Sequence, residues 1–176
     1  MQIDGLHIDT LTYRKALGHF ASGVALITTA EDGAIHGMTA NAFCSVSLNP
    51  PLVLICLDKS SRMHAILPRS NFYGISVLGR HQEVFSRHFA GRPQEGLHVP
   101  FVWHNNCPLL EGALAHLVCS VFKVYDAGDH TLYIGQVEYL QYSDDHAPLL
   151  FYSGKYQALE EKSSQYPAYM YDSTLW

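Results

Sequence analysis

The sequence predicts a mainly β protein with short helices, and it favours a closed antiparallel barrel over a parallel α/β sheet. Extended apolar or β-branched runs predict about six or seven strands, and helical patterns predict about three small helices. From residue 113 onward the chain is strongly extended. A parallel α/β sheet would instead alternate strands and helices throughout.

The three helical patterns are short. They lie at residues 10–20, 60–67 and 81–90. Asp9 or Thr10 can cap the first helix, and Pro68 is expected to end the second because proline lacks the N–H group that an inner helical turn requires. Gly91 follows the third helix where a left-handed capping residue is common.

The expected strands are separated by turn residues. They cover residues 24–29, 45–48, 52–57, 72–78, 113–125, 131–140 and 149–156, and a short extended piece after Asp32-Gly33 completes a hairpin with the first of them. Residues 92–108 contain Gly, Pro and Asn without a clear period, so they predict a long loop. Long loops in compact domains tend to be functional.

Length and composition fit one compact domain. We expect it over residues 1–160, followed by an aromatic tail over 161–176. The chain is 48% hydrophobic and 15% charged, and this low charge suggests that a partner covers part of the surface. The net charge of −5 argues against nucleic acid as the main ligand.

The N-terminal residues do not resemble a signal peptide, and no apolar run is long enough to span a bilayer. The four cysteines form no CxxC pair, so reduced thiols and a cytoplasmic location are expected. Rossmann, P-loop, GxSxG and HExxH motifs are absent. Residues 104–107 have ligand-like spacing but too few ligands near them, so no metal site is predicted.

Three stretches carry possible chemistry. Residues 39–47 are small and polar beside a buried strand, and their hydroxyls and amide can satisfy either the backbone or a ligand. Ser60 and Ser61, at the start of a helix, could hold a phosphate with Lys59 or Arg62 neutralising its charge. The alternative is that these serines only cap the helix.

The third stretch, GDHTLYIG at residues 128–135, is a turn that runs into a strand. His130 can be a turn residue with only a structural role, or it can face a ligand. Its functional interpretation depends on the other two stretches lying nearby.

Together, several stretches resemble the short-chain flavin reductases: ASGV, GMTANAFCSVSLNPP, SS at a helix start, RHFAG, GALA, GDHTLYIGQV and PLLFYSGKY. These are the reductase components of two-component flavin-dependent monooxygenases, such as those that hydroxylate phenol or 4-hydroxyphenylacetate. The resemblance covers residues 13–157. It implies a homodimeric, flavin-binding split β-barrel with antiparallel, Greek-key-like strands. It also implies FMN or FAD, NADH or NADPH as hydride donor, and a monooxygenase that receives reduced flavin.

The resemblance also implies the binding residues. Those lining the flavin would be Thr39, Ala40, Asn41, Ala42, Phe43, Ser45 and Val46. Those around its phosphate would be Ser60, Ser61 and Arg62, beside Lys59, and those beside the flavin tail would be Phe89 and Ala90. Those holding the nicotinamide cofactor would be His130, Ser153, Gly154, Lys155 and Tyr156. No catalytic protein residue is expected, because the cofactors carry out hydride transfer.

Two other functions are compatible with the same residues. One is a flavin-binding electron carrier or sensor on the same barrel. The other is a different flavoenzyme, such as an oxidase of a phosphorylated small molecule or a corrinoid reductase. Bleaching of the flavin by NADH or NADPH would separate a reductase from a carrier or sensor. A different flavoenzyme would turn over its own substrate without releasing reduced flavin.

Overall fold

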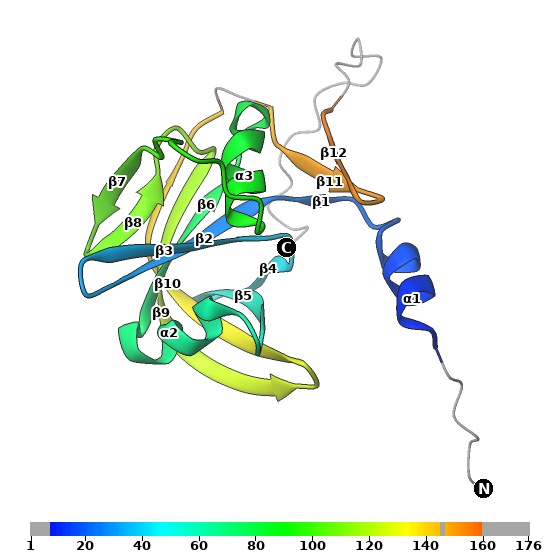
Figure 1. The fold of residues 1–176 in the computed structure, drawn as a ribbon. Coiled ribbons are helices and arrows are strands. Elements are labelled where there is room, and N and C mark those ends of the chain that lie inside the picture. Colours follow the sequence, from blue (N-terminus) through cyan, green and yellow to red (C-terminus); the bar gives the residue numbers. More distant parts are fainter. Residues whose placement is uncertain (1–7, 145–146, 160–176) are drawn as a thin grey trace, which may run out of the picture.

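A computed structural model describes residues 8–144 and 147–159 (Figure 1). Its centre is a seven-stranded sheet in the order β3-β2-β6-β9-β10-β5-β4, in which every pairing is antiparallel. The strands are β2 (Ala25–Glu31), β3 (Ala34–Ala40), β4 (Phe43–Leu48), β5 (Pro51–Asp58), β6 (Phe72–Val77), β9 (Ala115–Ala127) and β10 (His130–Tyr142). The predicted mainly β, antiparallel architecture is confirmed.

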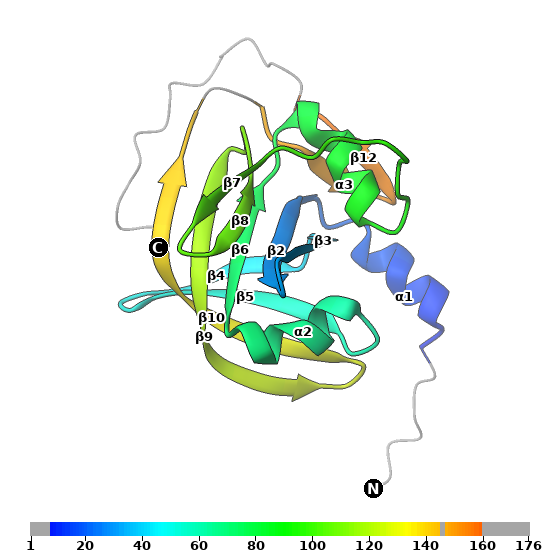
Figure 2. The same ribbon diagram turned by 60° about the vertical axis from the view of Figure 1, so that its left-hand side comes forward.

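The sheet is curved, and β3 and β4 are its two outer strands (Figure 2). Among the described residues no pairing joins these two strands, so the sheet is open where a closed barrel was expected. Residues 41 and 42 connect them. The aromatic tail expected at residues 161–176 lies outside the described residues.

Two smaller sheets and three helices surround the main sheet. The smaller sheets are β1-β11-β12 (Ser22–Gly23, Leu150–Tyr152 and Lys155–Gln157) and the hairpin β7-β8 (Phe101–His104 and Cys107–Leu110). The helices are α1 (Thr10–Leu17), α2 (Arg62–Ser70) and α3 (Glu83–Phe89), the last preceded by a 3₁₀ turn at Arg80–Gln82. Figures 1 and 2 show α3 and α2 on either side of the β2-β3 hairpin.

The long loop predicted at 92–108 is wrong over its second half, which forms the β7-β8 hairpin. Asn105 and Asn106 make its turn with φ values of 46° and 63°. Two consecutive left-handed residues are the geometry of a tight hairpin turn, and asparagine tolerates it. Cys107 and Leu109 behind the turn are buried.

The predicted end of α2 at Pro68 is also wrong, because the helix continues through this proline to Ser70. The helix ends instead at Asn71, which adopts a left-handed conformation with φ of 55° and donates its N–H to the Leu67 carbonyl at 3.0 Å. Other helix ends are confirmed. Asp9 caps α1 by accepting from the Thr12 N–H at 2.8 Å, and Gly91 follows α3 with φ of 80°.

The strand predicted at 149–156 is two strands, β11 and β12. Ser153 and Gly154 form the turn between them, with φ values of 48° and 78°. Strand β11 also pairs with β1, so the beginning and the end of the described chain meet in one small sheet.

The described core has a main cluster under the large sheet and a second one beneath α3. Leu26, Leu78, Leu110 and Leu149 are almost fully buried in the second cluster, and Phe89 of α3 packs against it. A β-carbon at Gly37 would lie 2.8 Å from the Phe89 ring, so glycine lets α3 approach β3 closely. Helix α3 is therefore held against the outer strand β3.

Helix α1 projects away from this body (Figure 1), and none of its residues is buried. Leu11, Tyr13 and Leu17 are 52–60% exposed. The chain after α1 is attached where the Ser153 N–H donates to the Gly18 carbonyl at 2.8 Å. Across the described part of the chain, the helices are too short and too polar to cross a membrane.

Candidate functional site

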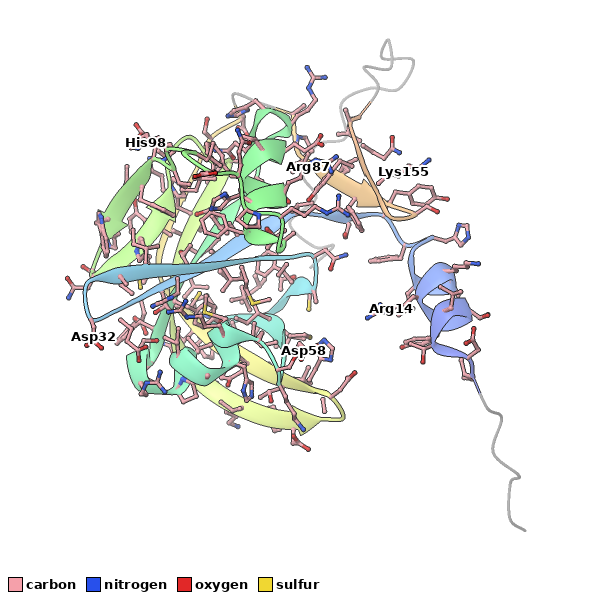
Figure 3. The ribbon with its side chains drawn as sticks, viewed as in Figure 1. Arg14, Asp32, Asp58, Arg87, His98 and Lys155 are labelled. Carbon is pink, nitrogen blue, oxygen red and sulfur yellow. The ribbon has the colours of Figure 1, made fainter. Side chains whose placement is uncertain are left out.

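A cavity of about 610 Å³ lies between the end of β3, helix α3 and the β11-β12 hairpin. Its lining residues are Val24, Thr39, Asn41, Glu83, Arg87, Ala90, Arg92, Phe151, Gly154, Lys155 and Tyr156. The volume falls within the range of pockets that hold small molecules and cofactors. Arg87 and Lys155 come to it from α3 and the hairpin (Figure 3).

Tyr156 joins the hairpin to α3. Its hydroxyl lies 2.7 Å from the hydroxyl of the fully buried Ser86, and the Arg87 guanidinium lies 4.8 Å above its ring centre. The Thr39 hydroxyl donates to the Ser86 carbonyl at 2.7 Å. These contacts connect three walls of the cavity, so the position of the hairpin depends on α3 and on β3.

Charged side chains in the cavity are mostly positive. Arg87, Arg92 and Lys155 line it, whereas Glu83 is the single carboxylate among its lining residues. Arg87 donates from Nε to Glu83 Oε1 at 2.7 Å, one helical turn away. Arg92 and Lys155 make no ion pair with the described residues, so the cavity suits an anionic ligand.

A smaller cavity of about 270 Å³ adjoins the first and shares Val24 and Asn41 with it. Phe43 lines it together with residues 20–23. The connection between β3 and β4 therefore borders both cavities.

The other residues predicted to line the flavin take different positions. Ala40 is buried in the main core, and the Ala42 carbonyl accepts from the Cys56 N–H at 3.2 Å. Ser45 and Val46 on the outer strand β4 are exposed.

The predicted phosphate residues lie at the start of α2. The Ser61 hydroxyl accepts from the His64 N–H at 3.2 Å and so caps the helix. Ser60 donates from both N–H and hydroxyl to Asp58, and these bonds lower the pKa of that carboxyl. The Lys59 ammonium donates to the Gly128 carbonyl at 2.6 Å and pairs with Asp126.

His130 begins β10 and lies opposite Asp58 of β5. Its Nδ1 lies 2.7 Å from the Asp129 carboxylate, and this hydrogen bond lowers the pKa of Asp129. His130 therefore belongs to the same region as the start of α2. In Figure 3, Asp58 lies well apart from Arg87 and Lys155.

The structure thus divides the predicted binding residues into two groups. The cavity brings together Thr39, Asn41, Ala90, Gly154, Lys155 and Tyr156. The second group, Lys59 to Arg62 with His130, gathers around the start of α2. Ser153 forms the hairpin turn, and Phe89 packs against the core under β3, beside the cavity but outside its lining.

Three charged lining residues were missed in the sequence: Glu83, Arg87 and Arg92. Glu83 and Arg87 are spaced four residues apart on a predicted helix, and helical geometry places such residues on one face with Ala90, which was assigned to the flavin tail. This spacing was the available signal. Arg92 follows Gly91 in the segment assigned to a loop, and no pattern marked it.

The family model for the flavin reductase like domain matches residues 17–160. The chain belongs to this family. It is 52% identical over 156 residues to an NADH-dependent flavin reductase from Rhodococcus sp., covering 87% of this chain and 88% of the relative. It is also 35% identical over 147 residues to the reductase component of 4-hydroxyphenylacetate 3-monooxygenase from Thermus thermophilus, covering 84% of this chain and 95% of the relative.

Solved structures of this family share the fold. The flavin reductase PheA2 superposes with a TM-score of 0.84 at 43% identity, covering 88% of this chain and all of that chain. The NADH:FAD oxidoreductase SgcE6 of Streptomyces globisporus, in complex with NAD and FAD fragments, gives a TM-score of 0.81 at 36% identity, with 88% and 95% coverage. The resemblance noted in the sequence is therefore confirmed.

The residues of this family member fit a flavin and a nicotinamide cofactor. Both cofactors carry phosphate groups, which Arg92 and Lys155 can neutralise. Asn41 offers an exposed amide beside the larger cavity, where the hydrogen-bonding edge of a planar ring can reach it. The cavity is also large enough for a substantial part of such a ligand.

Proposed function

We propose that this chain is a flavin reductase that transfers a hydride from NADH or NADPH to FMN or FAD and supplies the reduced flavin to a partner monooxygenase. The observation that carries the proposal is the positively charged cavity at the β3-β4 connection of a flavin reductase-like domain. The names of the relatives support it. They include an NADH-dependent flavin reductase and the reductase component of a monooxygenase.

The protein's part in this reaction is binding and orientation. When bound, the nicotinamide and flavin rings supply the hydride-transfer chemistry themselves. Arg92 and Lys155 hold phosphate oxygens, and Asn41 orients the edge of a ring. Tyr156, fixed by Ser86 and Arg87, forms an aromatic wall that keeps water from that side. Holding the rings at about 3–3.5 Å is the task that matters most for the rate.

The start of α2 is the second binding region of the proposal. The Ser61 oxygen accepts from a backbone N–H, but its own hydrogen remains available to a phosphate oxygen. Arg62 is exposed and has no ion-pair partner among the described residues. The first turn of a helix also attracts anions. Ser61 and Arg62 are therefore the members of this group that we assign to the flavin phosphate.

We further propose a homodimer with the split-barrel arrangement of the family. Exposed apolar side chains on α1 and on β4, among them Leu11, Leu17, Val46 and Leu48, support it. Apolar surface of this kind is characteristic of interfaces between copies of a chain. A cytoplasmic location is also proposed, because all four cysteines are free thiols.

Anaerobic mixing with NADH or NADPH tests the function. The protein should bleach the visible absorbance of added FMN or FAD catalytically, in amounts well above its own concentration. Bleaching that stops at one flavin per protein would indicate an electron carrier or sensor. Absence of bleaching, with turnover of a separate substrate, would indicate a different flavoenzyme. Addition of a flavin-dependent monooxygenase and its substrate in air should restore the absorbance while that substrate is hydroxylated.

A further inference from the structure

Glu83 places a carboxylate on the wall of the larger cavity. It begins α3 and is the single carboxylate among residues that line a cavity otherwise rich in positive charge. Both contacts with Arg87 use the same oxygen, Oε1, at 2.7 Å from Nε and 2.5 Å from Nη2. Within the described part of the chain, Oε2 accepts no hydrogen bond, so it stays available to a ligand.

Arg87 holds Glu83 in this orientation. The same guanidinium lies 4.8 Å above the centre of the Tyr156 ring, so its position is fixed from two sides. The Glu83 side chain is 40% exposed, although a surface carboxylate of this kind would ordinarily move freely. A pre-oriented carboxylate discriminates between ligands better than a mobile one, because less ordering is needed on binding.

Arg92 and Lys155 determine how many negative charges of a ligand the cavity can neutralise. Arg87 is occupied by Glu83 and Tyr156, whereas Arg92 and Lys155 keep their charge for a ligand. A dinucleotide diphosphate has one negative charge on each phosphate and so matches these two side chains. An additional phosphate would find no further cation free among the lining residues.

We propose that Glu83 is a specificity-determining residue that selects NADH over NADPH. This inference rests on the proposed function. The free carboxylate oxygen accepts hydrogen bonds from the 2′- and 3′-hydroxyls of the donor's adenosine ribose, as acidic residues do in other NAD sites. A 2′-phosphate would instead bring a charge of about −1.5 to −2 against this carboxylate.

Direct binding tests the assignment without turnover. Calorimetric titration of the full-length, flavin-free protein would compare adenosine 5′-monophosphate with adenosine 2′,5′-bisphosphate, and NADH with NADPH. We expect the unaltered protein to prefer the ligands with a free 2′-hydroxyl by about tenfold or more, which corresponds to about 1.4 kcal/mol. Glu83→Gln should reduce this preference to about twofold or less, chiefly by tightening the binding of the 2′-phosphorylated ligands.

Two control variants distinguish the effect of the Glu83 carboxylate on ligand preference from the effects of other charged residues. Glu95→Gln removes an exposed glutamate outside the cavity lining and should leave the preference unchanged. Arg87→Gln removes the partner but keeps the Glu83 carboxylate, so the preference for a free 2′-hydroxyl should persist or increase. If Arg87→Gln abolishes the preference as Glu83→Gln does, Glu83 acts only by holding the arginine and the assignment is overturned.

The unaltered protein is a test in its own right, even if Glu83→Gln fails to fold. Equal or tighter binding of NADPH would show that the cations dominate, and it would overturn the proposal. Failure of the reductase function has a different signature, because flavin would then not be bleached by either donor. Bleaching by both donors at equal efficiency would leave the reductase function intact and refute the role of Glu83.

Discussion

Replacement of Ser61 tests whether the start of α2 binds phosphate or is only capped. In the structure the Ser61 oxygen accepts from the His64 N–H, and its hydroxyl hydrogen is free to donate. The two roles are therefore compatible, and they use different parts of one hydroxyl group. Ser61→Ala removes both, whereas Ser61→Asp keeps the cap and places a negative charge where a phosphate would lie.

The magnitudes of the two effects follow from the geometry. Loss of a helix cap costs about 0.5–2 kcal/mol, and the 3.2 Å distance places this cap in the lower half of that range. Loss of a hydrogen bond to a charged phosphate costs about 1.5–3 kcal/mol, or roughly ten- to hundredfold in Kd for the flavin. Ser61→Ala should therefore weaken flavin binding more than it lowers the stability of the flavin-free protein.

The assay combines urea unfolding of the flavin-free protein with fluorescence titration of FMN and FAD. Ser61→Asp should retain most of the stability and bind flavin more weakly than Ser61→Ala does. Ser61→Thr, which keeps an acceptor and a donor, is the matched control and should resemble the unaltered protein. If Ser61→Asp binds flavin as the unaltered protein does, the hydroxyl has no phosphate partner and Ser61 is a cap alone.

Three further predictions concern other parts of the molecule. Gly135→Ala should destabilise the protein by about 1–3 kcal/mol in urea unfolding, because a β-carbon would overlap the Tyr73 hydroxyl and lie 2.8 Å from its Cζ; Tyr73→Phe should recover part of the loss, and no recovery would refute the clash. His130 lies apart from the cavity, so His130→Ala tests whether the donor reaches it: a donor contact should make kcat/KM for the donor fall by the value of one hydrogen bond, ~0.5–3 kcal/mol, with flavin affinity nearly unchanged; weaker flavin binding alone would place His130 with the flavin phosphate group, and equal weakening of both cofactors with a lower Tm would make it structural. The mass in solution should be about twice the 19.7 kDa chain, and lysine at both Leu11 and Leu17 should yield monomers if α1 contributes to the dimer interface.

Local patterns in the sequence predicted much of the fold. The helix caps at Asp9 and Gly91 and the turn at Asp32-Gly33 depend on single residues with strong conformational preferences, and all three occur in the structure. The β7-β8 hairpin was missed because its turn is Asn105-Asn106, which lacks the glycine that usually marks such a turn. The helix end predicted at Pro68 was wrong because the buried side chains of Met63, Ile66 and Leu67 hold the helix against the core, and it continues beyond the proline.

The sequence predicted the arrangement of the candidate site less well than it predicted the fold. Gly154, Lys155 and Tyr156 were expected at the nicotinamide cofactor, but their proximity to α3 depends on contacts between distant residues. Ser86 and Tyr156 are 70 positions apart, and no local pattern encodes their hydrogen bond. The separation of His130 from the cavity likewise follows from strand pairing, which places it opposite Asp58.

The pairing of β1 with β11 joins Ser22 to Phe151 and Gly23 to Leu150. During synthesis the ribosome releases residue 22 long before residue 151, so the cavity cannot acquire its last wall until the β11-β12 hairpin has been made. Contacts this distant in sequence also slow folding, because a large loop must close before they form. A nascent or truncated chain that ends before Leu150 lacks Lys155 and Tyr156, two of the cavity residues that we propose hold the cofactor. Under this proposal, cofactor uptake follows the pairing of β1 with β11, so it reports that both ends of the domain have met.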